Sequence, residues 1–128
     1  MRLLLDTHTF LWLAMDNENL SMAARAACAD PTNDLFLSVV SVWELVIKHS
    51  IGRLELEAPP EILVPRERKR IGARRLSLHE RDIFLLPNLP RHHGDPFDRM
   101  LVCQAIRGDL ALVTKDGHIP KYPIKTLW

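Results

Sequence analysis

Short apolar runs alternate along the chain with longer segments of mixed apolar and polar residues. Apolar residues at 1–6, 35–40 and 111–114 predict buried strands, and residues 73–78 and 124–128 predict two further strands. Residues 7–15, 21–29, 41–49, 61–70, 79–86 and 96–107 predict helices, and residues 31–34 and 87–95 predict loops. Strands that alternate with helices indicate an α/β fold with a mainly parallel sheet covered on both faces.

Length and composition favour one domain that spans residues 1–128. The chain has 128 residues and no linker long enough to divide it. Its net charge of +1 neither demands nor excludes a nucleic-acid partner, because local patches matter more than the total. Cys28 and Cys103 match no disulfide or zinc spacing, so we expect free, buried thiols. With no signal peptide and no apolar run of about 18 residues, we expect a cytoplasmic protein outside the membrane.

Three carboxylates occupy positions that capping or turn formation explains equally well. Asp6 follows the first predicted strand and would cap the next helix. Glu44 stands three residues after Ser41, which is the spacing of a capping box. Asp116 precedes a glycine at an ordinary turn. Taken singly, each residue is better explained by a structural role than by catalysis.

The segment HGDPFDRML contains two further carboxylates at the start of a predicted helix. Asp95 is a natural N-cap and Pro96 a natural first helical residue, which puts Asp98 in the first turn. A helix cap therefore accounts for Asp95, and a first-turn position accounts for Asp98, so each of them, taken singly, is also better explained by a structural role.

The shared location of these carboxylates changes their interpretation. In a parallel sheet the ligand crevice lies beyond the carboxyl ends of the strands, where residues after strands and in the first turns of helices converge. Clustered carboxylates repel one another unless a cation is present, and Mg²⁺ and Mn²⁺ prefer oxygen ligands. We therefore expect a divalent-metal site that hydrolyses a phosphodiester by a two-metal-type mechanism. Its catalytic and metal-binding residues would be Asp6, Glu44, Asp98 and Asp116.

Four segments resemble the PIN-domain ribonucleases, and more narrowly the VapC-type toxins of bacterial toxin–antitoxin modules. They are LLLDTHTFLW, SVVSVWELVIKHSIGRLEL, LPRHHGDPFDRMLVCQA and LALVTKDGHIPKYPIKTLW. The resemblance implies a three-layer α/β/α sandwich and a Mg²⁺- or Mn²⁺-dependent endoribonuclease. It also implies a homodimer and a cognate antitoxin, joined in a heterotetramer or larger assembly. The family's four acids fall on Asp6, Glu44, Asp98 and Asp116, and the similarity of DRMLVCQA selects Asp98 over Asp95. Asp95 is then a helix cap or an acid that supports the metal ligands.

Several other residues have both a functional and a structural interpretation. Thr114 would orient a carboxylate or water, or be a simple strand residue. His93 would contact phosphate or the Asp98 helix, or have only a loop role. A zinc site is not expected, because no cysteine or third histidine stands at a metal-binding spacing from His92 and His93. Arg74 and Arg75 end the basic stretch 66–75, which would attract RNA or form a solvated helix face. Arg99 would bind a backbone phosphate or an antitoxin carboxylate, or form a surface salt bridge.

Two other functions remain open at this stage. A phosphatase or phosphotransfer domain would use Asp6 as its nucleophile, but Thr7 and His8 follow it where a further acid is expected. A non-catalytic RNA- or protein-binding module with a PIN fold would have lost acids, whereas all four are present. Metal binding separates the ribonuclease from the binding module.

Overall fold

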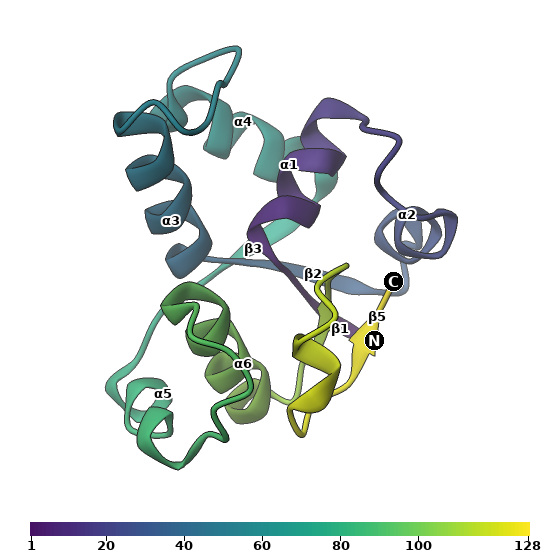
Figure 1. The fold of residues 1–128 in the computed structure, drawn as a ribbon. Coiled ribbons are helices and arrows are strands. Elements are labelled where there is room, and N and C mark those ends of the chain that lie inside the picture. The colour runs from purple at the N-terminus through teal and green to yellow at the C-terminus, as the bar shows by residue number, and fades with distance from the viewer.

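Five parallel strands form the central sheet of the protein, whose computed structural model describes residues 1–128 (Figure 1). The order of the strands is β3-β2-β1-β4-β5, so the first strand is central. The strands are β1 (Arg2–Leu5), β2 (Asp34–Ser38), β3 (Ala73–Leu76), β4 (Ala111–Val113) and β5 (Thr126–Leu127).

Helices cover both faces of this sheet, as the sequence predicted. Alternate residues of β1 belong to different cores: Leu3 and Leu5 pack with α1, α2 and α4, whereas Leu4 packs with α6. The result is a three-layer α/β/α sandwich, in which α3 contributes to both cores through Val40 and Leu45. The helices are α1 (Thr7–Met15), α2 (Met22–Ala29), α3 (Val39–Ser50), α4 (Pro60–Ile71), α5 (Glu80–Ile83) and α6 (Pro96–Gly108).

Most predicted elements lie within two residues of their observed bounds, but two regions differ. The predicted helix 79–86 is shorter, because α5 ends at Ile83 and a 3-10 turn, η1 (Leu86–Asn88), enters the predicted loop. A second 3-10 turn, η2 (Ile119–Lys121), precedes β5. None of the helices is long and apolar enough to cross a membrane.

The junction between β2 and α3 was predicted wrongly. The strand ends at Ser38, and the helix begins at Val39 instead of Ser41. Ser38 caps the helix, because its Oγ accepts a hydrogen bond from the Val40 N–H at 3.0 Å. Ser41 therefore lies inside α3, so Glu44 is not the third residue of a capping box.

Parallel pairing brings the ends of the central strands to one edge of the sheet. Leu5 pairs with Leu37 of β2 on one side and with Val113 of β4 on the other. Asp6, the residue after Leu5, donates its backbone N–H to the Val113 carbonyl at 3.2 Å. Residues that follow β1, β2 and β4 thus meet at this edge, where the sequence placed the candidate site.

Candidate active site

One pocket of about 440 Å³ at the carboxyl edge of the sheet collects acidic side chains from four parts of the chain. Two lysines, Lys48 and Lys115, also line this acidic pocket. Five carboxylates against two ammonium groups leave an excess of negative charge. The carboxylates are Asp6, Glu44, Asp95, Asp98 and Asp116, which include all four predicted site residues.

Asp6 both caps α1 and lines the acidic pocket. Its backbone is extended, and its Oδ1 accepts a hydrogen bond from the Thr9 N–H at 2.7 Å. The Thr9 hydroxyl donates to the Val113 carbonyl at 2.8 Å, which ties the first turn of α1 to β4. Capping thus occupies one carboxylate oxygen and orients the other, so the structural and functional interpretations of Asp6 are compatible.

Glu44 projects from α3 with both of its carboxylate oxygens engaged. Thr7 Oγ1 donates to Oε1 at 2.6 Å, and Lys48 Nζ lies 2.5 Å from Oε2. The residue is only 3% exposed, so these two partners replace solvent around a buried charge. Lys48 was not identified from the sequence, although its spacing of four residues from Glu44 in a helix was a usable signal.

Asp98 carries the strongest sign of crowded negative charge. It lies in the first turn of α6, where Asp95 is the N-cap and accepts from the Phe97 and Asp98 N–H groups at 2.9 and 3.1 Å. Burial raises the pKa of Asp98 to about 8, and the charges of the other four carboxylates add to the effect. The pocket therefore favours a neutral Asp98 unless a cation is present.

Asp116 is held in a tight turn that follows β4. Its backbone N–H donates to Thr114 Oγ1 at 3.0 Å, and its Oδ1 accepts from the His118 N–H at 2.8 Å. Thr114 is buried at the end of the strand. The threonine hydroxyl thus positions the backbone of Asp116, a more specific role than the sequence suggested.

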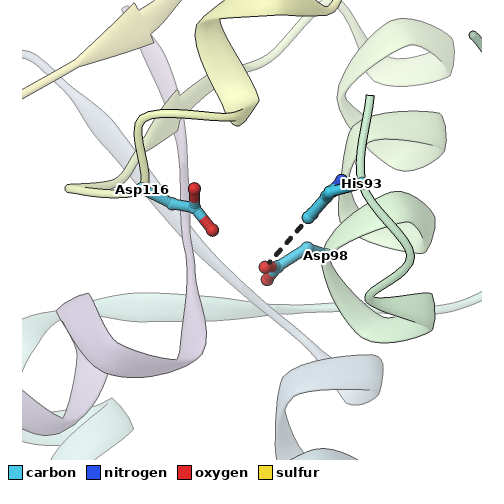
Figure 2. A group of neighbouring side chains, drawn as sticks. All are labelled: His93, Asp98 and Asp116. Atoms are coloured by element: carbon cyan, nitrogen blue, oxygen red, sulfur yellow. Dashed lines mark ion pairs between the residues drawn. The ribbon is translucent and has the colours of Figure 1, made fainter. Parts of the chain in front are cut away.

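His93 completes a small group with Asp98 and Asp116. Figure 2 shows the three side chains facing one another from a loop, the start of α6 and the turn after β4. One potential ligand atom from each residue lies within 4.8 Å of the other two. His93 Nε2 is 3.5 Å from Asp98 Oδ2, so the predicted proximity of His93 to the acids is observed.

Arg99 is buried and forms no surface salt bridge, and its predicted contact with RNA stays a prediction. The residue is 8% exposed, and its guanidinium faces the protein interior. Its Nη1 donates to the Pro90 carbonyl at 2.9 Å, and its Nη2 donates to the Leu89 carbonyl at 3.4 Å. Arg99 therefore holds the loop before α6 in place.

Arg74 and Arg75 are exposed on β3, the edge strand of the sheet. Neither residue lines the acidic pocket. Within the basic stretch that precedes them, Arg66 pairs with Glu57 and Arg70 with Glu67. Part of that basic charge is therefore neutralised locally, and contact between β3 and RNA stays a prediction.

Sequence comparison assigns the family. The family model described as "PIN domain" matches residues 3–125, nearly the whole chain. The chain therefore belongs to the PIN domain family. It is 30% identical over 124 residues to Ribonuclease VapC22 of Mycobacterium tuberculosis, covering 91% of this chain and 88% of that protein.

Solved structures with the same fold include two VapBC assemblies. VapBC2 from Rickettsia felis, bound to a DNA fragment from its promoter, matches with a TM-score of 0.74 and 14% identity, covering 98% of this chain and 97% of that chain. VapBC-1 from nontypeable Haemophilus influenzae matches with a TM-score of 0.63 and 17% identity, covering 98% and 96%. These likenesses confirm the predicted PIN-like α/β fold.

Proposed function

We propose that this protein is a divalent-metal-dependent endoribonuclease that acts as the toxin of a toxin–antitoxin pair. The observation that carries the proposal is the acidic pocket, in which burial and the surrounding carboxylates raise the pKa of Asp98 to about 8. Membership of the PIN domain family and similarity to a protein named as a VapC ribonuclease support the same conclusion.

The residues of the pocket fit a hard divalent cation. All five acidic groups offer oxygen, the donor that Mg²⁺ and Mn²⁺ prefer. A cation would offset the burial and the repulsion that keep Asp98 protonated. Asp6, Asp98 and Asp116 are its first candidates as ligands, because both oxygens of Glu44 are already engaged by Thr7 and Lys48.

The proposed reaction is hydrolysis of an RNA phosphodiester. Bound divalent ions supply a water of lowered pKa and charge stabilisation of the leaving oxygen, as in two-metal nucleases. Lys48 and Lys115 line the pocket and would offer positive charge to the phosphate of the RNA. Thr114 fixes the turn that carries Asp116. Arg74 and Arg75 would bind RNA backbone beyond the pocket by releasing counterions.

The proposed partners are a cognate antitoxin protein and a second copy of this chain. Support comes from the solved VapBC assemblies that share its fold at full length. A homodimer that binds antitoxin as a heterotetramer or larger assembly would keep the nuclease inactive. We place this assembly in the cytoplasm, where RNA substrates occur.

The test is RNA cleavage by purified protein with Mn²⁺ or Mg²⁺, compared with the same reaction in EDTA. Asp98→Asn and Asp6→Asn should abolish cleavage, because each removes a carboxylate from the pocket while keeping a similar shape. Glu18→Gln is the matched control, since Glu18 is exposed and lies outside the pocket. Cleavage that persists in both pocket variants would overturn the site assignment. A protein that binds neither metal would instead be the non-catalytic module.

A further inference from the structure

A hydrogen-bonded row of three side chains ends at Asp98. Arg99 Nη1 lies 3.2 Å from the Tyr122 hydroxyl, which lies 2.7 Å from His93 Nδ1. The other ring nitrogen of His93, Nε2, lies 3.5 Å from Asp98 Oδ2 (Figure 2). We call Arg99, Tyr122 and His93 the His93 triad; its members come from α6, the residue after η2 and the loop before α6.

Arg99 determines the direction of the first hydrogen bond. A guanidinium has only donors, so the Tyr122 oxygen must accept from it. The bonds from Arg99 to the carbonyls of Leu89 and Pro90 fix the guanidinium against the loop. The Tyr122 hydroxyl therefore has one lone pair already engaged and its own proton still to place.

Tyr122 determines the direction of the second bond. The residue is 3% exposed, so solvent does not provide an acceptor for its phenolic proton. His93 Nδ1 is the acceptor within hydrogen-bond distance. The opposite arrangement, with Nδ1 donating to Tyr122, would leave a buried hydroxyl proton unpaired, which folded proteins avoid. Nδ1 is thus unprotonated, and a neutral ring carries its proton on Nε2.

We propose that the His93 triad holds His93 as the Nε2–H tautomer, so that His93 is a positioning residue that donates to Asp98. Nε2 is buried without a hydrogen-bond partner, and Asp98 Oδ2, at 3.5 Å, is an acceptor that a small approach would bring into hydrogen-bond distance. Asp98 accepts from an N–H donor in either protonation state, because a protonated carboxyl keeps an acceptor oxygen and an ionised one has only acceptors. The role of Asp98 as a metal ligand rests on the proposed function.

The alternative is that His93 binds the metal directly. Its Nε2 lies near oxygens of Asp98 and Asp116 in a group compact enough to surround an ion. Direct binding requires a lone pair on Nε2, and therefore the proton on Nδ1. The two roles differ in the position of a single proton, which makes them distinguishable by experiment.

The decisive measurement is long-range proton–nitrogen correlation NMR of the ¹⁵N-labelled full chain, without metal and with saturating Mg²⁺. The ring signals of His93 are assigned by their absence from His93→Gln. We expect protonated Nε2 and unprotonated Nδ1 in both states. An unprotonated Nε2, in either state, would overturn the proposal.

Tyr122→Phe tests the source of the tautomer while keeping the aromatic ring. Without the phenolic donor, Nδ1 no longer has to act as an acceptor, so a fraction of His93 protonated on Nδ1 should appear. An Nδ1 that stays fully unprotonated in Tyr122→Phe would overturn the role assigned to the triad. Backbone amide spectra of the variant establish that it has kept its fold.

Mg²⁺ affinity, measured by calorimetry, then tests the effect on the site. His93→Leu should weaken binding by about tenfold or more, as for other residues that orient metal ligands, whereas His93→Gln should recover most of it through its amide donor. His49→Leu is the matched control, because His49 lies in the last turn of α3 and outside the pocket. Equal losses in the Gln and Leu variants would contradict a donor role.

Failure of the proposed function looks different. If the wild-type chain bound no Mg²⁺ and cleaved no RNA, the metal-free tautomer of His93 would still decide the inference about the triad. Conversely, RNA cleavage with an unprotonated Nε2 would refute the triad alone.

Discussion

Lys48 and Glu44 form an ion pair one helical turn apart on α3, with Nζ 2.5 Å from Oε2. The glutamate side chain is 4% exposed and the lysine side chain 36%, so the carboxylate is buried and its partner reaches solvent. Lys48 therefore places a positive charge inside a pocket that otherwise gathers carboxylates. Lys48 thereby reduces the repulsion among the carboxylates, as a bound metal ion would also do.

Replacing Lys48 by methionine should destabilise the metal-free protein by about 1–2 kcal/mol, because a buried carboxylate loses its charged partner. The same change should strengthen Mg²⁺ binding, since the pocket becomes more negative. Urea unfolding in EDTA and calorimetric titration measure the two effects. Lys115→Met is the control, because Lys115 lines the same pocket without a carboxylate in ion-pair distance. Equal destabilisation by both changes would contradict the role of the pair.

The raised pKa of Asp98 predicts that the metal-free protein loses stability as pH rises. Between the ordinary carboxyl pKa of 3.8 and about 8, the folded protein holds a proton that the unfolded chain has released. Unfolding then releases a proton, so the free energy of unfolding falls with rising pH across that window and levels off above it. Asp98→Asn should remove this dependence and gain on the order of 2 kcal/mol at pH 8.5. Urea unfolding in EDTA from pH 5 to 9 provides the test, and identical slopes would refute it.

Metal binding should release a proton from Asp98, because a cation stabilises the ionised carboxylate. Calorimetric titration with Mg²⁺ at pH 7, in two buffers with different ionisation enthalpies, measures that release. We expect close to one proton for the wild type and almost none for Asp98→Asn. A hundredfold excess of Mg²⁺ over its Kd should also stabilise the fold by about 2.7 kcal/mol. Binding without proton release would show that Asp98 is already ionised in the free pocket.

Ser38 and Ser41 offer a matched pair of substitutions on α3. Ser38 Oγ accepts from the Val40 N–H and donates to Gln104 Oε1 at 2.6 Å, whereas Ser41 Oγ is buried without a partner. Ser38→Ala should therefore cost about 2 kcal/mol, through a lost cap and an unpaired Gln104. Ser41→Ala should be neutral or slightly stabilising. Urea unfolding measures the loss of stability in each variant. A larger loss in Ser41→Ala than in Ser38→Ala would instead support the predicted capping box at Ser41.

The fold was largely predictable because its strands and helices differ clearly in hydrophobic pattern. Leu3, Leu4 and Leu5 form an uninterrupted apolar run, which a strand buried on both faces requires. The β2–α3 junction was less predictable, since FLSVVSVW is apolar except for two serines, and both of these suit a cap. Ser38 is the cap because it is buried and hydrogen-bonded to Gln104, a residue far away in the sequence.

The acidic residues of the site were predictable for a similar reason, and its other members were not. Asp6 and Asp116 follow strands, so topology alone brings them to the same edge. Arg99 follows Asp98 in sequence and looked equally exposed, but the helix turns it by about 100° towards the interior. Tyr122 reaches His93 only through the packing of the C-terminal segment, a contact that no local pattern encodes.

The position of Asp6 directly after β1 limits how the length of this chain can vary. Each residue advances a strand by about 3.3 Å and reverses the direction of its side chain. One inserted residue in β1 would turn the side chains of the strand to the opposite faces of the sheet, so that Leu4 would enter the core that now contains Leu3 and Leu5. It would also move Asp6 away from the other acids. The segment 51–59 between α3 and α4 contributes nothing to the pocket. Insertions should be tolerated at its exposed start, residues 51–53, which is the natural place for a tag or a fused domain, because Leu54, Leu56 and Ala58 pack against the core.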